Sequence, residues 1–250
     1  MLPEPSPTWL SIVIFASWVA GIAKVAFGVG AGVFLTPLLT LVLPPKVAVG
    51  LMWPVMFVTD ISALHHHWRK WDTRQVLVLL PTCFVGIIVG SLFLAWAPSE
   101  LVRKAIGIIA LLFVALQLAR SRRGAGKPTA PMPIWAGWII GFLGGIVTSL
   151  SHSGGIIISI YLLSVGLTKN VFIASLVSIF FVGNLVKFPL YWQTGILTPP
   201  ILLTGLALTP VMLLGGRAGL LLNRRVTVAQ FTKAIVLIVG LSGLVLLANP

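Results

Sequence analysis

The chain has 250 residues, of which 58% are hydrophobic and only 8% are charged, and its formal net charge at pH 7 is +13. So little charge excludes an ordinary soluble domain and indicates an integral membrane protein with short loops. The basic residues lie in short clusters between apolar segments, as in membrane proteins, so we expect no nucleic-acid partner. The single cysteine, Cys83, lies in an apolar run, which excludes an internal disulfide and predicts an inert buried thiol.

Eight apolar segments follow one another along the chain. Two of them, 9–43 and 134–167, are too long for one span, and clusters of small residues at 28–32 and 149–155 interrupt them. Glycine weakens a helix and permits sharp reversals, so we expect a break at each cluster. The eleven residues after each break form about 16 Å of helix, which reaches only the middle of a ~30 Å hydrocarbon core. Both segments are therefore predicted to be re-entrant hairpins. The other six have the length of full spans: 46–68, 75–97, 101–119, 168–193, 199–222 and 227–248.

The two halves of the chain repeat each other at a constant offset of 124 residues. The matching pairs include Gly21 and Gly145, Gly30 and Gly154, Leu38 and Leu162, Phe57 and Phe181, and Asp60 and Asn184. After one length change the offset becomes 129, where Lys104 falls on Lys233. Two similar halves are typical of secondary transporters, whose substrate site lies where the halves meet.

The basic residues between the segments predict the orientation. With both hairpins re-entrant, Lys46, Arg103 and Lys104 face one side and the other twelve loop residues face the opposite side, which the positive-inside rule makes cytoplasmic. Each half then has three full spans, an odd number, so the halves are inverted and both termini are periplasmic. The stretch 120–133 is the cytoplasmic linker between a first repeat, 1–119, and a second, 134–250. The first five residues lack a basic n-region, so no removable signal peptide is expected.

This pattern predicts an all-α polytopic membrane protein of two inverted repeats, each a re-entrant hairpin plus three transmembrane helices. The hairpin tips are the predicted binding site for an anion, because broken helices present free N–H groups and positive dipole ends. The predicted glycines of this site are Gly28, Gly30, Gly32, Gly154 and Gly155. The side-chain donors of the second tip are Ser149, Ser151, His152 and Ser153. In a second interpretation these serines only satisfy the broken backbone.

Ionisable residues within the apolar segments complete the predicted site. Lys24 and Lys187 attract the anion in one interpretation; in the other, Lys24 pairs with Asp60 and Lys187 extends to the outer interface. Asn184 lies three residues before Lys187 on the same helical face. Asp60 is the one acidic residue well inside a span, so it is the candidate for proton coupling, with a structural hydrogen bond as the alternative.

No metal or cofactor motif is recognised. His152 has no second ligand at metal-binding spacing. His65, His66 and His67 are consecutive, so on a helix they point in different directions and do not converge on one ion. The tryptophans that follow, Trp68 and Trp71, favour an aromatic belt at the cytoplasmic interface.

Short stretches along nearly the whole chain resemble the sulfite exporter TauE/SafE family of membrane transporters. They are the glycine cluster 28–32 with Thr36-Pro37-Leu38, then 44–50, Gly154-Gly155, 184–189 and 195–198. The resemblance implies export of sulfite, small organosulfonates or related anions across a bacterial inner membrane. Two departures are that the first hairpin has a less dense glycine run, and that the second has Ser-His-Ser where many relatives have Gly-Ile-Gly. A polar tip there favours a substrate with hydrogen-bonding oxygens.

The sequence therefore predicts a secondary transporter that exports sulfite or an organosulfonate such as sulfoacetate. An inside-negative potential favours anion efflux by about 2.3 kcal/mol per charge per 100 mV. The alternatives are a passive anion channel and an importer of another oxyanion, such as sulfate, on the same fold. A membrane-embedded enzyme is not expected, since the sequence contains no paired carboxylates, helical zinc motif or nucleophile elbow. Assembly into a homo-oligomer stays open.

Overall fold

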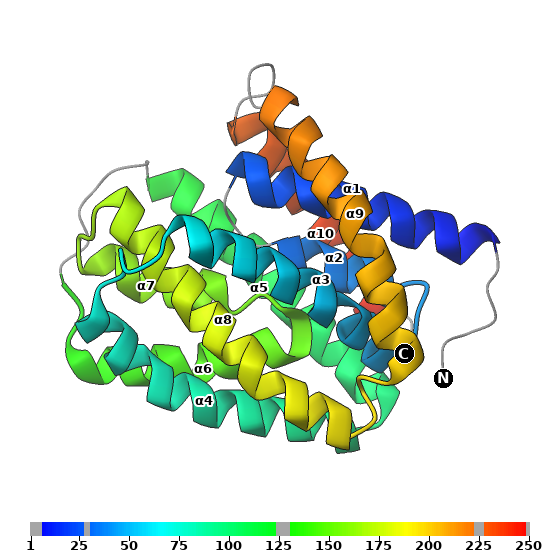
Figure 1. Cartoon of the computed structure of the whole chain (residues 1–250), viewed down its shortest axis with the longest axis horizontal. Helices are drawn as coiled ribbons and strands as arrows, with labels where there is room; N and C mark the ends of the chain where they lie inside the picture. The colour runs from blue at the N-terminus through cyan, green and yellow to red at the C-terminus, as the bar shows by residue number, and fades with distance from the viewer. Residues whose placement is uncertain (1–6, 28–30, 124–130, 223–227, 249–250) are drawn as a thin grey trace.

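The computed structural model describes residues 7–27, 31–123, 131–222 and 228–248, and every regular element within these ranges is an α-helix (Figure 1). The helices of the first half are α1 (Pro7–Phe27), α2 (Ala31–Thr40), α3 (Pro45–His66), α4 (Thr73–Trp96) and α5 (Ser99–Arg123). Those of the second half are α6 (Ile134–Ser151), α7 (Gly155–Ser164), α8 (Lys169–Gln193), α9 (Pro199–Leu222) and α10 (Val228–Ala248). The prediction of an all-α fold is confirmed.

Six described helices are long and apolar enough to cross a membrane: α3, α4, α5, α6, α8 and α9. This set includes α6, which the sequence predicted as one arm of a hairpin. α10, predicted as a span, has 21 residues, but its side chains are described only over Lys233–Ala248, so its role as a span stays a prediction. The chain is a multi-pass membrane protein.

Each of the two long apolar segments is split into a longer helix and a ten-residue helix. α1 ends at Phe27 and α2 begins at Ala31, with residues 28–30 outside the described part; α6 ends at Ser151 and α7 begins at Gly155. In the second break His152 has a left-handed backbone conformation, with φ 51° and ψ 24°, which ends α6 sharply. The breaks lie at the small-residue clusters from which they were predicted.

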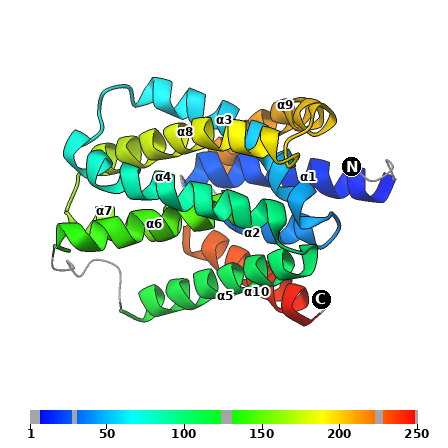
Figure 2. The same cartoon turned by 90° about the horizontal axis from the view of Figure 1, so that it is seen from below.

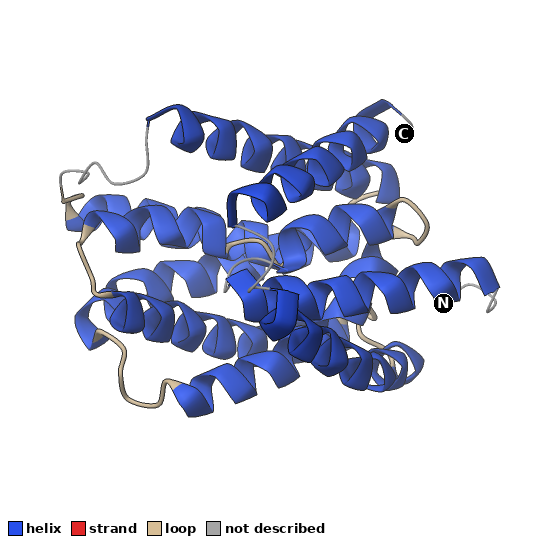
Figure 3. Ribbon diagram, turned by 90° about the horizontal axis from the view of Figure 1, so that it is seen from above, coloured by secondary structure: helices blue, strands red, loops and turns tan. Residues whose placement is uncertain are grey.

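The two hairpins open toward opposite ends of the molecule (Figures 1 and 2). α1 begins and α10 ends at one end of the long axis, toward which α1 and α2 open, whereas α6 and α7 open toward the other end (Figure 2); Figure 3 shows the same bundle from the opposite side. The tips meet, because an added Cβ on Gly32 would lie 2.5 Å from the carbonyl oxygen of His152. Two ten-residue return helices placed end to end are about 30 Å long, which matches a hydrocarbon core.

Glycines bring helices of opposite halves into backbone contact. α4 lies along α6, where an added Cβ on Gly145 would be 2.9 Å from the Cα of Gly86. α9 lies along α1, where an added Cβ on Gly21 would be 2.7 Å from the backbone nitrogen of Gly216. Small residues permit such close approach of membrane helices. Because Gly21 and Gly145 are equivalent in the repeat, the two helix pairs use the same positions.

Where α3 meets α8, residues contact their own repeat equivalents. The rings of Phe57 and Phe181 are stacked with centroids 5.7 Å apart. Three residues further on, the side chains of Asp60 and Asn184 are joined by a 2.7 Å hydrogen bond. Contacts between equivalent positions are what a two-fold relation produces at its axis. Equivalent positions of the two halves are therefore in contact where α3 meets α8.

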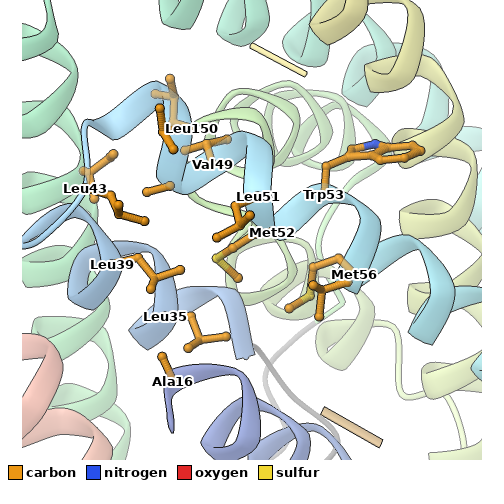
Figure 4. Close-up of a cluster of buried hydrophobic side chains, with 14 of the residues drawn as sticks. Ala16, Leu35, Leu39, Leu43, Val49, Leu51, Met52, Trp53, Met56 and Leu150 are labelled. Atoms are coloured by element: carbon orange, nitrogen blue, oxygen red, sulfur yellow. The ribbon is translucent and has the colours of Figure 1, made fainter. Parts of the chain in front are cut away.

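A buried apolar cluster fixes α2 against α3 (Figure 4). Leu35 and Leu39, four residues apart, place one face of α2 in this cluster, with Leu51 and Met52 of α3; Leu43, in the turn after α2, packs in the same cluster. The packing holds the short helix α2 in place although its N-terminal end lies in the interior.

Candidate functional site

Buried polar side chains gather at the break between α6 and α7. They come from α2, α3, α6 and α8: Thr36, Asp60, Thr148, Asn184, Lys187 and Tyr191. The three residues from α8 share one helical face, since they are three and four residues apart. This face therefore carries a polar stripe into the centre of a mainly apolar bundle.

Lys187 is the one lysine that is almost fully buried among the side chains the structure describes, at 1% exposure. Its Nζ donates to the backbone oxygen of Thr148 at 3.0 Å, to Thr148 Oγ1 at 3.1 Å and to Asn184 Oδ1 at 3.1 Å. An ammonium group has three N–H donors, and all three are used here. The alternative in which Lys187 extends to the outer interface is therefore wrong.

Asn184 connects Lys187 to Asp60. Its Nδ2 donates to Asp60 Oδ2 at 2.7 Å while its Oδ1 accepts from the lysine. Only this orientation of the amide suits both neighbours, because a carboxylate accepts and an ammonium donates. Trp53 Nε1 donates to the backbone oxygen of Asn184 at 3.0 Å and fixes the helix at this point. Asp60, Asn184 and Lys187 thus form one continuous polar chain from α3 to α8.

The last carbonyl groups of α6 need partners from other helices, because the helix ends inside the bundle. The oxygen of Thr148 accepts from Lys187 Nζ and from the N–H of His152, both at 3.0 Å. The oxygen of Ser149 accepts from the Tyr191 hydroxyl at 2.6 Å, and that of Ser151 accepts from Thr36 Oγ1 at 2.9 Å. α8 and α2 therefore cap α6, and a cation at this negative end of the helix dipole is favourable.

The N-terminus of α7 lies at the same junction. Within the described part of the chain, the N–H groups of Gly154 and Gly155 have no backbone acceptor, whereas that of Ile156 donates to the oxygen of Ser153 at 3.1 Å. An added Cβ on Gly154 would lie 2.8 Å from the Cβ of Thr148, the residue that holds Lys187. Thr148 therefore contacts both the ammonium of Lys187 and the first turn of α7, whose donor N–H groups and positive dipole end are suited to an anion.

The serines of this tip bond mainly to backbone. Ser149 Oγ lies 3.1 Å from the carbonyl oxygens of Ile87 and Gly145, in the contact between α4 and α6. Ser153 Oγ donates to the oxygen of Ser151 at 2.8 Å. These bonds are those expected if the serines satisfy the broken backbone.

His152 ties the tip to α3. Its Nε2 lies 3.1 Å from the backbone oxygen of Val49, and since a carbonyl only accepts, Nε2 carries the proton. Three predicted site positions lie outside the described part of the chain: Gly28, Gly30 and the side chain of Lys24. The predicted pairing of Lys24 with Asp60 stays a prediction.

Sequence reasoning did not select four residues of this junction: Thr36, Trp53, Thr148 and Tyr191. Tyr191 had a usable signal, since it lies four residues after Lys187 on the predicted polar face. Thr148 lies one residue before the small-residue cluster. Nothing in the sequence marks Thr148 as a partner of Lys187, because that contact joins two helices.

The fold and this junction define a multi-pass helical membrane protein with an interior polar site. A model of the family described as Sulfite exporter TauE/SafE matches residues 13–246, and the chain belongs to that family. No curated protein and no solved structure matches the chain. Family membership identifies a membrane transporter of sulfur-related anions.

Proposed function

We propose that the chain is a secondary transporter that exports a small sulfur oxyanion, sulfite or an organosulfonate such as sulfoacetate, across the inner membrane of a bacterium. One observation carries the proposal: the buried ammonium of Lys187 bonds to Thr148, and Gly154, whose N–H has no backbone acceptor among the described residues, packs against that same threonine. Family membership supports the sulfur-related class of substrate.

The charge of Lys187 favours an anionic substrate. A buried charge is unfavourable unless it is paired and hydrogen-bonded. Among the described residues, the acceptors of Lys187 are the neutral oxygens of Thr148 and Asn184 rather than a carboxylate. In this proposal an oxyanion accepts from Lys187 and from the N–H groups of Gly154 and Gly155, and is the direct anionic partner that Asp60, bonded to Lys187 only through Asn184, does not supply. The tetrahedral or pyramidal oxygens of a sulfonate or sulfite suit several converging donors.

Two features support transport by alternating access. The glycine contacts of α4 with α6 repeat in those of α9 with α1, and the hairpins open toward opposite ends of the molecule (Figure 2). Both are consistent with inverted repeats whose tips meet at one central site, with the termini on the periplasmic side. In this proposal Asp60 carries the coupling proton, and its protonation is sensed at Lys187 through Asn184.

Sulfite flux in proteoliposomes tests the proposal. We expect sulfite release that competes with sulfoacetate, is lost in Lys187→Met and is retained in Lys104→Gln. Lys104 is the matched control, because its side chain is 41% exposed and pairs with Glu100 at 2.6 Å, away from the junction. Flux from wild-type vesicles no faster than from protein-free vesicles would contradict the proposal. Dependence on a pH gradient, lost in Asp60→Asn, tests the coupling.

A further inference from the structure

Lys187 cannot bind an anion without giving up a bond that it makes in this conformation. All three donors of its ammonium are on protein oxygens at 3.0 to 3.1 Å. A substrate oxygen must therefore displace one of these acceptors. The identity of the displaced acceptor decides how binding changes the protein.

The three acceptor oxygens of Lys187 differ in the other bonds that fix their positions. Asn184 Oδ1 is fixed in direction, because its own amide nitrogen is bonded to Asp60 at 2.7 Å. The carbonyl oxygen of Thr148 keeps a second partner, the N–H of His152 at 3.0 Å, and is part of the helix backbone. Thr148 Oγ1 is bonded to Lys187 alone within the described part of the chain, and a hydroxyl can rotate. The hydroxyl is the acceptor that is most easily replaced.

We propose that the Thr148 hydroxyl is a stand-in for a substrate oxygen, and that its displacement from Lys187 loosens the end of α6 from α8. This inference rests on the proposed transport of an oxyanion at the junction. Thr148 is a positioning residue here: it acts through Lys187 and competes with the substrate for the same ammonium.

The position of Thr148 links binding to movement of the hairpin tip. Two side chains of α8 hold the last turn of α6: Lys187 on Thr148, and Tyr191 on the oxygen of Ser149 at 2.6 Å. When the anion replaces the hydroxyl, one of these three bonds is lost, and those of Lys187 to the Thr148 carbonyl and of Tyr191 to the Ser149 carbonyl remain. Gly154 lies against Thr148, so a shift of Thr148 also moves the first turn of α7.

Sulfite transport kinetics of Thr148 variants test the proposal. Thr148→Val keeps the shape of the side chain and removes the competing acceptor, so we expect KM for sulfite to fall about tenfold without a rise in kcat. Thr148→Ser restores the acceptor and should return KM toward the wild-type value. Thr204→Val is the control, because the Thr204 hydroxyl is exposed on α9 and bonds only to Pro200 among the described residues.

Two results in this assay would overturn the proposal. A KM that rises in Thr148→Val means that the hydroxyl contacts the substrate. An unchanged KM with a lower unfolding temperature means that the hydroxyl is only structural. Either result leaves the proposed function intact as long as wild-type vesicles release sulfite, whereas absence of wild-type release removes the proposed function itself.

Hydrogen exchange at the tip gives a second readout that does not need transport by a variant. In detergent, sulfite is expected to speed the exchange of amides in 148–157 of the wild-type protein. In Lys187→Met the same amides should exchange fast with or without sulfite, because the bond to Thr148 is missing. Exchange in Lys187→Met as slow as in the wild-type protein would overturn the proposed loosening of α6, even if Thr148→Val fails to fold.

Discussion

Replacing Gly145 with alanine should separate α4 from α6 and lower stability. An added Cβ on Gly145 would lie 2.9 Å from the Cα of Gly86 and would overlap the carbonyl oxygen of Cys83. Both neighbours are backbone atoms of a long helix, which cannot turn aside as a side chain can. The two helices must therefore move apart along much of their contact.

The expected magnitude follows from two opposing terms. Ordinary contact begins at 3.4 Å, so the backbone at Gly86 must retreat by at least 3.4 − 2.9 = 0.5 Å. Overpacking of this kind destabilises by about 1–3 kcal/mol, and a contact between two backbones belongs at the upper end. Alanine also improves helix propensity by about 1 kcal/mol over glycine. The net loss is about 2 kcal/mol, or roughly 4–8 °C in unfolding temperature for a chain of this size.

Gly240→Ala is the matched control for this substitution. A Cβ there would meet only Val114 Cγ2, at 3.7 Å, which is ordinary contact. The gain in helix propensity then acts alone, and the unfolding temperature should rise by roughly 2 °C. Gly21→Ala is the reciprocal variant, since its Cβ would overlap the carbonyl oxygen of Met212 in the equivalent contact of α1 with α9.

Thermal unfolding of the purified protein in detergent measures all three variants. We expect Gly145→Ala and Gly21→Ala to lose similar amounts and Gly240→Ala to lose nothing. Unfolding of Gly145→Ala at or above the wild-type temperature would refute the argument from backbone contact. A loss in Gly145→Ala without one in Gly21→Ala would refute the reciprocal packing of the two halves.

Two further predictions concern the polar junction. Lys187→Met should abolish sulfite flux while changing stability by no more than about 1–2 kcal/mol, because an apolar side chain of similar size also removes the desolvation penalty of a buried charge; a large loss of stability measured by thermal unfolding would instead make Lys187 a structural cap. The exchange Asp60→Asn with Asn184→Asp should keep the bond between the two positions but place the carboxylate beside Lys187, so the double variant should unfold near the wild-type temperature and transport sulfite at least tenfold more slowly. A wild-type rate of sulfite transport in that double variant would show that the carboxylate can occupy either position 60 or position 184 without effect.

The helix breaks could be predicted from the sequence because their cause is local. Glycine and serine clusters weaken a helix wherever they occur, so the ends of α1 and α6 and the starts of α2 and α7 follow from composition and segment length. The reciprocal helix contacts were partly visible as well, since Gly21 and Gly145 are equivalent in the repeat. That these glycines contact the opposite half, through α9 and α4, requires the tertiary structure.

The partners within the junction could not be predicted, because they depend on how helices distant in sequence face each other. Both interpretations of Lys187 fitted its place on α8, and only the packing of α6 against that face selects the interior one. The serines of the tip attracted attention through their chemistry, yet their hydroxyls bond to nearby backbone. Thr148 and Tyr191 were not predicted, because their roles come from contacts with another helix: Thr148 with Lys187, and Tyr191 with the oxygen of Ser149.

Residues that are alike in the two halves form the helix packing, whereas positions that differ between the halves carry the polar groups of the candidate site. Phe57 stacks on its equivalent Phe181, and glycines at equivalent positions form the contacts of the two helix pairs. About one helical turn further on, the two equivalent positions carry different side chains, since the carboxylate of Asp60 accepts from the amide of Asn184. Two aspartates at this contact would repel, and two asparagines would leave no carboxylate to orient the amide toward Lys187. The carboxylate of Asp60 gives the amide one direction, and with it gives the buried ammonium of Lys187 a defined position against Thr148 at the end of α6.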